Sequence, residues 1–214
     1  VYMFDGTTVS MPDTAPNQQA YPQVGNQKPG LGFPIARVGA LTSLSCGAIL
    51  NLGVCQYAGK GQGEVSLLRQ LWGLLSPRDV LLTDRLMANW LNIFLLAQRG
   101  IELVARLNKA NRKADFRCGK RLAHHDHIVR WYKPSSIRSL DWQTYKTLPE
   151  YVTIRETLVR VAKPGFRTKT IVVVTTMLDH RQTTPEDLAT LYRARWNNYL
   201  DLRSIKSTMQ LQHL

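Results

Sequence analysis

The apolar positions of the first 57 residues form three short β-prone runs. These runs are Val1 to Phe4, Phe33 to Leu44 and Gly47 to Tyr57. The last two are separated by a Ser-Cys-Gly segment typical of a hairpin. Residues 12–32 are rich in Pro, Gly, Asn and Gln, which predicts a surface loop without regular structure. The chain is therefore predicted to begin with three antiparallel strands.

Helical and strand-like patterns alternate in the next 50 residues. Leucines and a tryptophan at steps of three and four predict a helix over residues 67–75, ended by Pro77. Residues 79–83 form a short apolar run typical of a buried strand, and residues 87–98 have a helical pattern. A further strand is predicted over residues 101–107.

The last 107 residues combine β-prone runs with one helix. Residues 127–132, 151–161 and 168–177 are predicted strands. Thr184 and Pro185 suit the start of a helix that continues through residue 206. The whole order predicts an α/β fold, a mixed sheet flanked by helices, with a β-rich insertion before the last helix. We divide it into a first core part (1–107), the insertion (108–177, whose last strand can rejoin the core) and a C-terminal core helix (178–214).

Charge changes this picture by indicating a partner. The chain has 28 Lys and Arg residues against 15 Asp and Glu, a formal charge of +13. Residues 108–170 contain 15 of these cations and five of the acids. Such a basic segment favours a polyanion such as nucleic acid. The three cysteines of the chain form no Cys-x-x-Cys pair, and no segment approaches the roughly 18 apolar residues of a membrane span. We expect no membrane association, a location in the cytoplasm or nucleoid, and a chain cut from a longer protein.

Two aspartates follow predicted strands. Asp5 comes directly after the first apolar run, and Asp84 follows the strand at 79–83. Hard divalent cations prefer carboxylate oxygens, and paired ions support in-line phosphodiester chemistry. The alternative is that both residues simply form turns, as aspartates after strands commonly do.

One edge of the predicted C-terminal helix mixes apolar and basic residues. Steps of three and four place on this edge Leu188, Leu191, Tyr192, Arg195, Tyr199, Leu202 and Lys206. The mixture is typical of a helix that borders a site for an anion. The alternative is an amphipathic helix whose basic side chains extend into solvent.

Several separated motifs resemble the DDE transposases of bacterial insertion sequences, and most closely the IS-four type. They are Asp5-Gly-Thr-Thr-Val-Ser-Met-Pro-Asp-Thr14, Gly30-Leu-Gly-Phe-Pro34, Leu81-Leu-Thr-Asp-Arg85 and Asp126-His-Ile-Val-Arg-Trp-Tyr-Lys-Pro134. The signature Tyr-x2-Arg-x3-Glu-x6-Lys of that group aligns with Tyr192, Arg195 and Lys206, and Arg203 lies within it. The resemblance implies a ribonuclease H-like domain with a β-rich insertion, which agrees with the predicted element order.

The resemblance also implies roles for individual residues. Asp5 and Asp84 would hold two Mg²⁺ or Mn²⁺ ions for hydrolysis and strand transfer. Double-stranded DNA, both transposon ends and target, would be the partner, bound by a homodimer. Phosphates of the transposon end would contact Tyr192, Arg195, Arg203 and Lys206. Cations of the insertion, Lys120, Arg121, Arg130 and Lys133, would lie along the DNA. Trp131 would stack on an unpaired base, with a buried core tryptophan as the alternative.

Tyr199 departs from the signature, which has glutamate at this place. A neutral phenol is a poor Mg²⁺ ligand beside two carboxylates. On a helix, Asp201 would lie about 200° away from position 199, and Glu186 about 20 Å along the axis. Neither Asp201 nor Glu186 can replace the missing carboxylate. Tyr199 therefore occupies the third catalytic position, which argues against DNA cleavage by this chain.

Three alternatives remain open from the sequence. A tyrosine recombinase would use a tyrosine nucleophile, as Tyr199 with the His127-x-x-Arg130 motif would suggest. The cluster at 124–127, with Cys118 and His180, would suit zinc. A non-catalytic DNA-binding remnant of a transposase is the third, and Tyr199 favours it.

Overall fold

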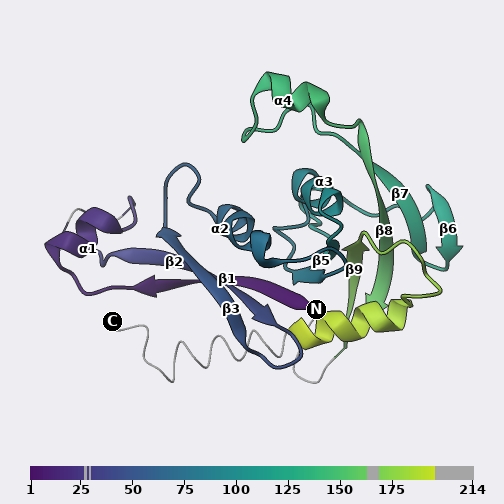
Figure 1. The fold of residues 1–214 in the computed structure, drawn as a ribbon, viewed down its shortest axis with the longest axis horizontal. Helices are drawn as coiled ribbons and strands as arrows, with labels where there is room; N and C mark the ends of the chain where they lie inside the picture. The colour runs from purple at the N-terminus through teal and green to yellow at the C-terminus, as the bar shows by residue number, and fades with distance from the viewer. Residues whose placement is uncertain (27, 29, 163–168, 196–214) are drawn as a thin grey trace. The chain divides into compact units, whose positions relative to one another are not determined.

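The computed structural model describes residues 1–26, 28, 30–162 and 169–195. The chain forms two compact units, Val1–Ser76 with Ala194–Leu214, and Pro77–Arg193. Each contains strands and helices, and the described residues include parallel and antiparallel pairs. The protein is therefore of the α/β class with mixed strand pairing, as its sequence predicts (Figure 1).

In its described part, the first unit has three antiparallel strands in the order β3-β2-β1. They are β1 (Tyr2–Ser10), β2 (Ile35–Ser43) and β3 (Ile49–Gln56), followed by helix α2 (Glu64–Leu71) and the 3₁₀ turn η1 (Trp72–Leu74). The predicted hairpin is thus confirmed. One expectation was wrong, because the loop at 12–32 contains the short helix α1 (Ala15–Ala20), capped by the Thr14 hydroxyl.

A row of glycines explains how α2 packs on this sheet. Gly6 pairs with Gly39, and Gly39 pairs with Gly53, so the three lie side by side across the strands. A Cβ on Gly39 would lie 2.8 Å from the Phe4 ring and 3.2 Å from Leu67. The absence of side chains in this row lets the buried face of α2 approach the strands closely.

The described residues of the second unit include six strands in the order β4-β5-β9-β8-β7-β6. Their bounds are β4 (Val80–Thr83), β5 (Glu102–Arg106), β6 (Lys120–Ala123), β7 (Asp126–Tyr132), β8 (Tyr151–Arg160) and β9 (Thr170–Thr175). Helix α3 (Trp90–Gln98) connects β4 to β5, which are parallel, and the other pairs are antiparallel. The strands of the basic segment therefore extend the sheet that begins with β4 and β5.

The three strands predicted in the basic segment are confirmed as β7, β8 and β9, but two further elements were missed. These are the short strand β6 and helix α4 (Trp142–Thr147). Helix α4 lies in the connection between β7 and β8, and Figure 1 shows it beyond the ends of these strands and apart from α3. Its N-terminus is capped by Asp141, whose Oδ1 accepts the Thr144 N–H at 2.9 Å.

A last described helix covers residues 185–195. The Asp187 amide donates to the Thr184 hydroxyl at 3.2 Å, and the Thr184 amide donates to the Asp187 carboxylate at 2.9 Å. This reciprocal pair is a capping box, so the predicted helix start is confirmed. In the described residues no helix is long and apolar enough to cross a membrane.

Candidate nucleic-acid interface

A basic groove follows the outer edge of β7. Strand β6 pairs with β7 only from Asp126 to Ile128, so beyond that point no strand of the described chain pairs with β7 on the side away from β8. The resulting cavity has a volume of about 650 Å³ and is called the β7 groove here; it is lined by Arg112, Cys118, Gly119, Lys120, Ile128, Val129, Arg130, Tyr132 and Thr153.

Gly119 allows the chain to approach β7 where the groove begins. Its φ is +78°, a left-handed conformation that favours glycine. A Cβ at this position would lie 2.3 Å from the Ile128 carbonyl oxygen. The glycine therefore sets the path that places Lys120 beside β7.

The groove is positively charged. Three cations line it, Arg112, Lys120 and Arg130, and no acidic residue is among its nine lining residues. Arg112 is held at the rim, with its Nε 3.5 Å from Glu156 Oε1 and its guanidinium 4.9 Å from the Trp131 ring centre. Arg130 lies over the Tyr151 ring at 4.4 Å. Lys120 and Arg130 form no ion pair with any residue that the structure describes, and such exposed cations attract a polyanion.

Exposed aromatic rings accompany these cations. Tyr132 is 68% exposed, and its ring makes an edge contact with that of Tyr151 at 6.1 Å. On α4, Trp142 is 63% exposed and stacks on Tyr145 at 5.4 Å, with the Lys146 ammonium 4.9 Å from the Trp142 ring. Basic surfaces with exposed rings are typical of nucleic-acid interfaces, because bases stack on aromatic faces.

Trp131 was predicted to stack on a base, with a buried core residue as the alternative. The structure supports the alternative, because Trp131 is buried. It is 6% exposed, and its indole Nε1 donates to Glu156 Oε1 at 2.7 Å. Its carbonyl accepts from the Trp90 indole at 2.8 Å. The Trp131 ring is thus buried in the core. The next residue, Tyr132, is the exposed aromatic residue of this strand.

The other cations predicted to bind DNA differ in whether their side chains are free to contact a ligand. Lys120, Arg121 and Arg130 are exposed. The Lys133 ammonium donates to the carbonyls of Tyr145 and Leu148, at 3.1 and 2.9 Å, and so holds the end of α4. Lys133 therefore has a structural role, and its charge is partly used within the protein.

Two residues of the histidine and aspartate cluster, Asp126 and His127, are built into the sheet, whereas His124 and His125 lie exposed in the turn before β7. Buried Asp126 accepts two hydrogen bonds from Arg155, at 2.8 and 2.6 Å. Buried His127 lies 3.1 Å from Glu156 Oε2 and 2.7 Å from the Cys118 carbonyl. Among the residues that the structure describes, no group of three His, Cys, Asp or Glu side chains could hold a metal. These contacts give Asp126 and His127 a structural role in the sheet.

Asp84 lies where it was predicted, directly after β4. It is half-buried, and its Oδ1 accepts the Leu86 amide at 2.8 Å, which closes a turn. This turn uses one carboxylate oxygen. Carboxylate oxygens are hard donors that suit Mg²⁺ or Mn²⁺, so the residue type fits such an ion.

Asp5 does not end its strand as expected. It lies in the middle of β1, which continues to Ser10 because the Thr-Thr-Val-Ser run after Gly6 stays extended and pairs with β2. Its carboxylate is half-buried and accepts the Gly6 amide at 3.0 Å. Asp5 belongs to the first unit and Asp84 to the second. A metal site that uses both stays a prediction.

The predicted DNA-contacting residues of the C-terminal helix fall into two sets. Tyr192 is 1% exposed and therefore contributes to the core instead of presenting a hydroxyl at the surface. Arg195, on the same helix, is half-buried. Tyr199, Arg203 and Lys206 lie outside the described residues.

Several residues of this surface were not predicted as site residues, among them Arg112, Tyr132 and Tyr151. A period of two along β7 was the available signal, since buried Val129 and Trp131 alternate with exposed Arg130 and Tyr132. Arg112 and Tyr151 are remote in sequence from β7's outer edge and carry no such signal. Known protein-family models and curated proteins were compared with this sequence, and none of them matches it.

Proposed function

We propose that this chain is the catalytic-domain region of an IS-four-type DDE transposase, a bacterial cytoplasmic protein that binds double-stranded DNA as a homodimer. The order of the sequence motifs supports this proposal. Three antiparallel strands followed by a parallel strand, helix and strand unit are compatible with a ribonuclease H-like domain. The proposal therefore joins the motifs to an arrangement that suits them.

The observation that carries DNA binding is the β7 groove. It presents Arg112, Lys120 and Arg130 beside the exposed ring of Tyr132, without an acid in its lining. A duplex carries closely spaced phosphates, so a groove with three cations gains affinity by releasing counterions. Exposed side chains and an open β7 edge leave this surface accessible.

DNA binding is tested by fluorescence anisotropy of the native chain with a labelled duplex. We expect binding at 50 mM salt and a loss of at least about tenfold in affinity at 200 mM, because three phosphate contacts would release about three counterions. Absence of binding at low salt would refute the proposal.

The metal-binding part of the proposal concerns Asp5 and Asp84. Their carboxylates would hold Mg²⁺ or Mn²⁺, which would activate water and then the DNA 3′-hydroxyl when bound. The turn at Asp84 holds its carboxylate in one orientation through the Leu86 amide. An oriented carboxylate loses less conformational entropy when it binds an ion.

Tyr199 gives the second part of the proposal, that the native chain binds DNA without cleaving it. A phenol at this place removes the third carboxylate of the signature. This is also the observation that favours a non-catalytic remnant of a transposase as the second candidate function.

Tyr199→Glu tests whether that one substitution abolishes cleavage. In the full-length protein, and on plasmid DNA carrying the sequences that flank the coding region, we expect Mg²⁺-dependent nicking by the variant and none by the native protein. Tyr199→Gln is the control, because glutamine has nearly the size of glutamate but carries no charge. This variant should stay inactive. If Tyr199→Glu fails to nick DNA while still binding it, the remnant is the better description.

A further inference from the structure

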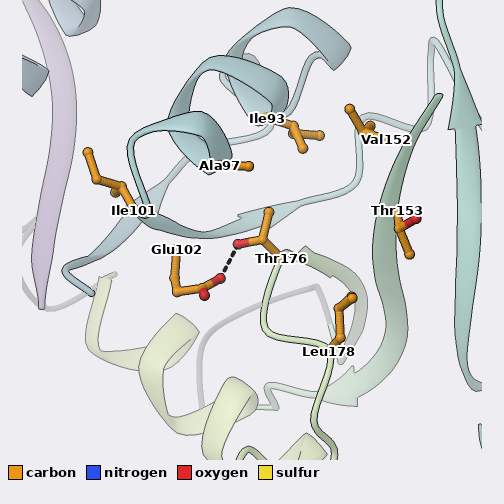
Figure 2. Close-up of a pocket in the computed structure, with 9 residues that line it drawn as sticks. Ile93, Ala97, Ile101, Glu102, Val152, Thr153, Thr176 and Leu178 are labelled. Atoms are coloured by element: carbon orange, nitrogen blue, oxygen red, sulfur yellow. Dashed lines mark hydrogen bonds between the residues drawn. The ribbon is translucent and has the colours of Figure 1, made fainter. Parts of the chain in front are cut away.

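A second pocket of the Pro77–Arg193 unit shares one lining residue, Thr153, with the β7 groove. Its volume is about 330 Å³, within the range of small-ligand sites, and its apolar walls come from Ile93, Ala97, Ile101, Val152 and Leu178. Figure 2 shows the Glu102 carboxylate hydrogen-bonded to the Thr176 hydroxyl below the strand that bears Glu102, with Ile93 and Ala97 above that strand. The pocket therefore combines apolar walls with two threonines and one acidic group.

The Glu102 carboxylate is held in a fixed orientation. The Thr176 hydroxyl donates to Glu102 Oε2 and accepts the Leu103 amide at 2.9 Å, so both of its hydrogen-bonding functions are used. The backbone is fixed as well, since the Glu102 amide donates to the Asp79 carbonyl at 2.8 Å. The carboxylate needs no reorganisation to bind a ligand.

Glu102 forms no ion pair with any residue that the structure describes, although cations outnumber acids in this chain. One of its oxygens is used by Thr176 and the other is available for a ligand. A guanidinium binds a carboxylate best through both oxygens at once, whereas an ammonium is a point charge that needs only one. The apolar walls would cover an aliphatic stem.

We propose that this pocket binds a primary ammonium group carried on an aliphatic stem, such as a lysine side chain or a small alkylamine. It adjoins the surface proposed for DNA, since Thr153 lines both, but the Glu102 carboxylate and the apolar walls belong to this pocket alone. Glu102 lies beside Val80, the first residue of β4, while Asp84 follows the last residue of that strand. Four residues of strand separate the two by about 13 Å. The inference does not depend on DNA binding.

Binding is measured on the full chain by NMR, with isoleucine methyl groups labelled. Ile93 and Ile101 line the pocket, and the other isoleucines serve as internal references. We expect n-hexylammonium to shift the Ile93 and Ile101 signals in a saturable manner. Its affinity should exceed that of 1-hexanol by about tenfold, the value of one charge-assisted hydrogen bond, with hexanoate the weakest.

Variants identify the groups responsible. Glu102→Gln should reduce the affinity for hexylammonium about tenfold and leave the affinity for hexanol unchanged. Glu150→Gln removes an exposed acid of the same unit outside the pocket and should change nothing. Ala97→Leu fills the cavity and should abolish binding of both probes, which tests the site even if Glu102→Gln does not fold.

Two further probes separate the sources of the ammonium. Nα-acetyl-lysine amide binding at least as tightly as hexylammonium assigns the pocket to a protein side chain, and weaker binding assigns it to a small amine. Equal affinity for hexanol and hexylammonium, unmoved Ile93 and Ile101 signals, or undiminished amine binding by Glu102→Gln would overturn the proposal.

Discussion

At the scale of single residues, neighbouring side chains along β7 have opposite roles. Val129 and Trp131 point into the core, and Arg130 and Tyr132 point outward. Acidic residues inside the sheet also neutralise part of the local charge, because Asp126 binds Arg155 and Glu156 binds Arg112. The basic character of the segment at its surface therefore depends on a few exposed cations more than on the total count.

Arg155→Ala should strongly destabilise the protein. Arg155 is buried and donates to both oxygens of Asp126 and to the Thr183 carbonyl, so its removal leaves a buried carboxylate without a counter-charge. We expect a loss of about 3–5 kcal/mol in the free energy of unfolding, measured with urea. Arg121→Ala, which removes an exposed arginine of β6, should change it by less than about 0.5 kcal/mol. Equal effects would contradict a structural role for Arg155.

Gly119→Ala should deform the β7 groove as well as strain the backbone. The added Cβ would lie 2.3 Å from a backbone oxygen, which must move. Gly47 also has a positive φ, +70°, and a Cβ there would meet nothing within 4 Å. Gly47→Ala therefore reports the backbone strain alone, about 1 kcal/mol. Urea unfolding should show a clearly larger loss for Gly119→Ala; equal losses would mean that the close approach has no consequence.

At the scale of elements, helix ends and glycines fix where each element begins and how closely it packs. The row Gly6, Gly39 and Gly53 lets α2 lie on the first sheet, and the capping box at Thr184 starts the last described helix. Hydrogen bonds from the Thr184 hydroxyl and then its amide hold the pKa of the Asp187 carboxyl below its ordinary value. The stability of the helix start is therefore expected to depend on pH.

Thr184→Ala tests this cap. Loss of the hydroxyl should lower the free energy of unfolding by about 1 kcal/mol at pH 7. A carboxyl group with a lowered pKa in the folded state stabilises that state above its unfolded pKa, about 3.9, and this contribution is lost as pH falls. The difference between native protein and variant should therefore shrink below about pH 4. Thr190→Ala, at an exposed position within the helix, is the control and should show no such pH dependence.

The elements that were predicted from the sequence have strong periodic signals, and those that were missed do not. The hairpin β2–β3, the unit β4–α3–β5 and the start of the last helix follow apolar periods or caps over several residues. Helices α1 and α4 are six residues each and have no buried residue, so no apolar stripe marks them. The misplaced end of β1 has a similar cause, since Thr, Val and Ser after Asp5 continue the strand through pairing with β2.

Site residues were harder to predict, because burial and charge pairing depend on contacts between distant segments. Trp131 and Tyr192 are suitable for DNA contacts by residue type, but both are buried. Lys133 is a cation whose ammonium holds α4 through two carbonyls. Nothing in the local sequence shows these partners, which are 12 and 15 residues away for Lys133.

At the scale of the whole molecule, the +13 charge is unevenly distributed, and this unevenness motivates the proposed function. The basic segment forms an extended sheet whose outer edge is open along part of β7, and two cations of the groove, Lys120 and Arg130, form no ion pair with any described residue. The central claim is that this groove is a DNA-binding surface.

The most direct test compares the salt dependence of DNA binding between two double variants. Lys120→Gln with Arg130→Gln removes two cations from the β7 groove, and Lys28→Gln with Lys60→Gln removes two exposed cations elsewhere. The slope of log affinity against log salt should fall by about 0.9 for each phosphate that is no longer neutralised, so by nearly two for the groove variant, and little for the control. Identical slopes for the two variants, or affinity independent of salt, would contradict the assignment of DNA binding to this groove.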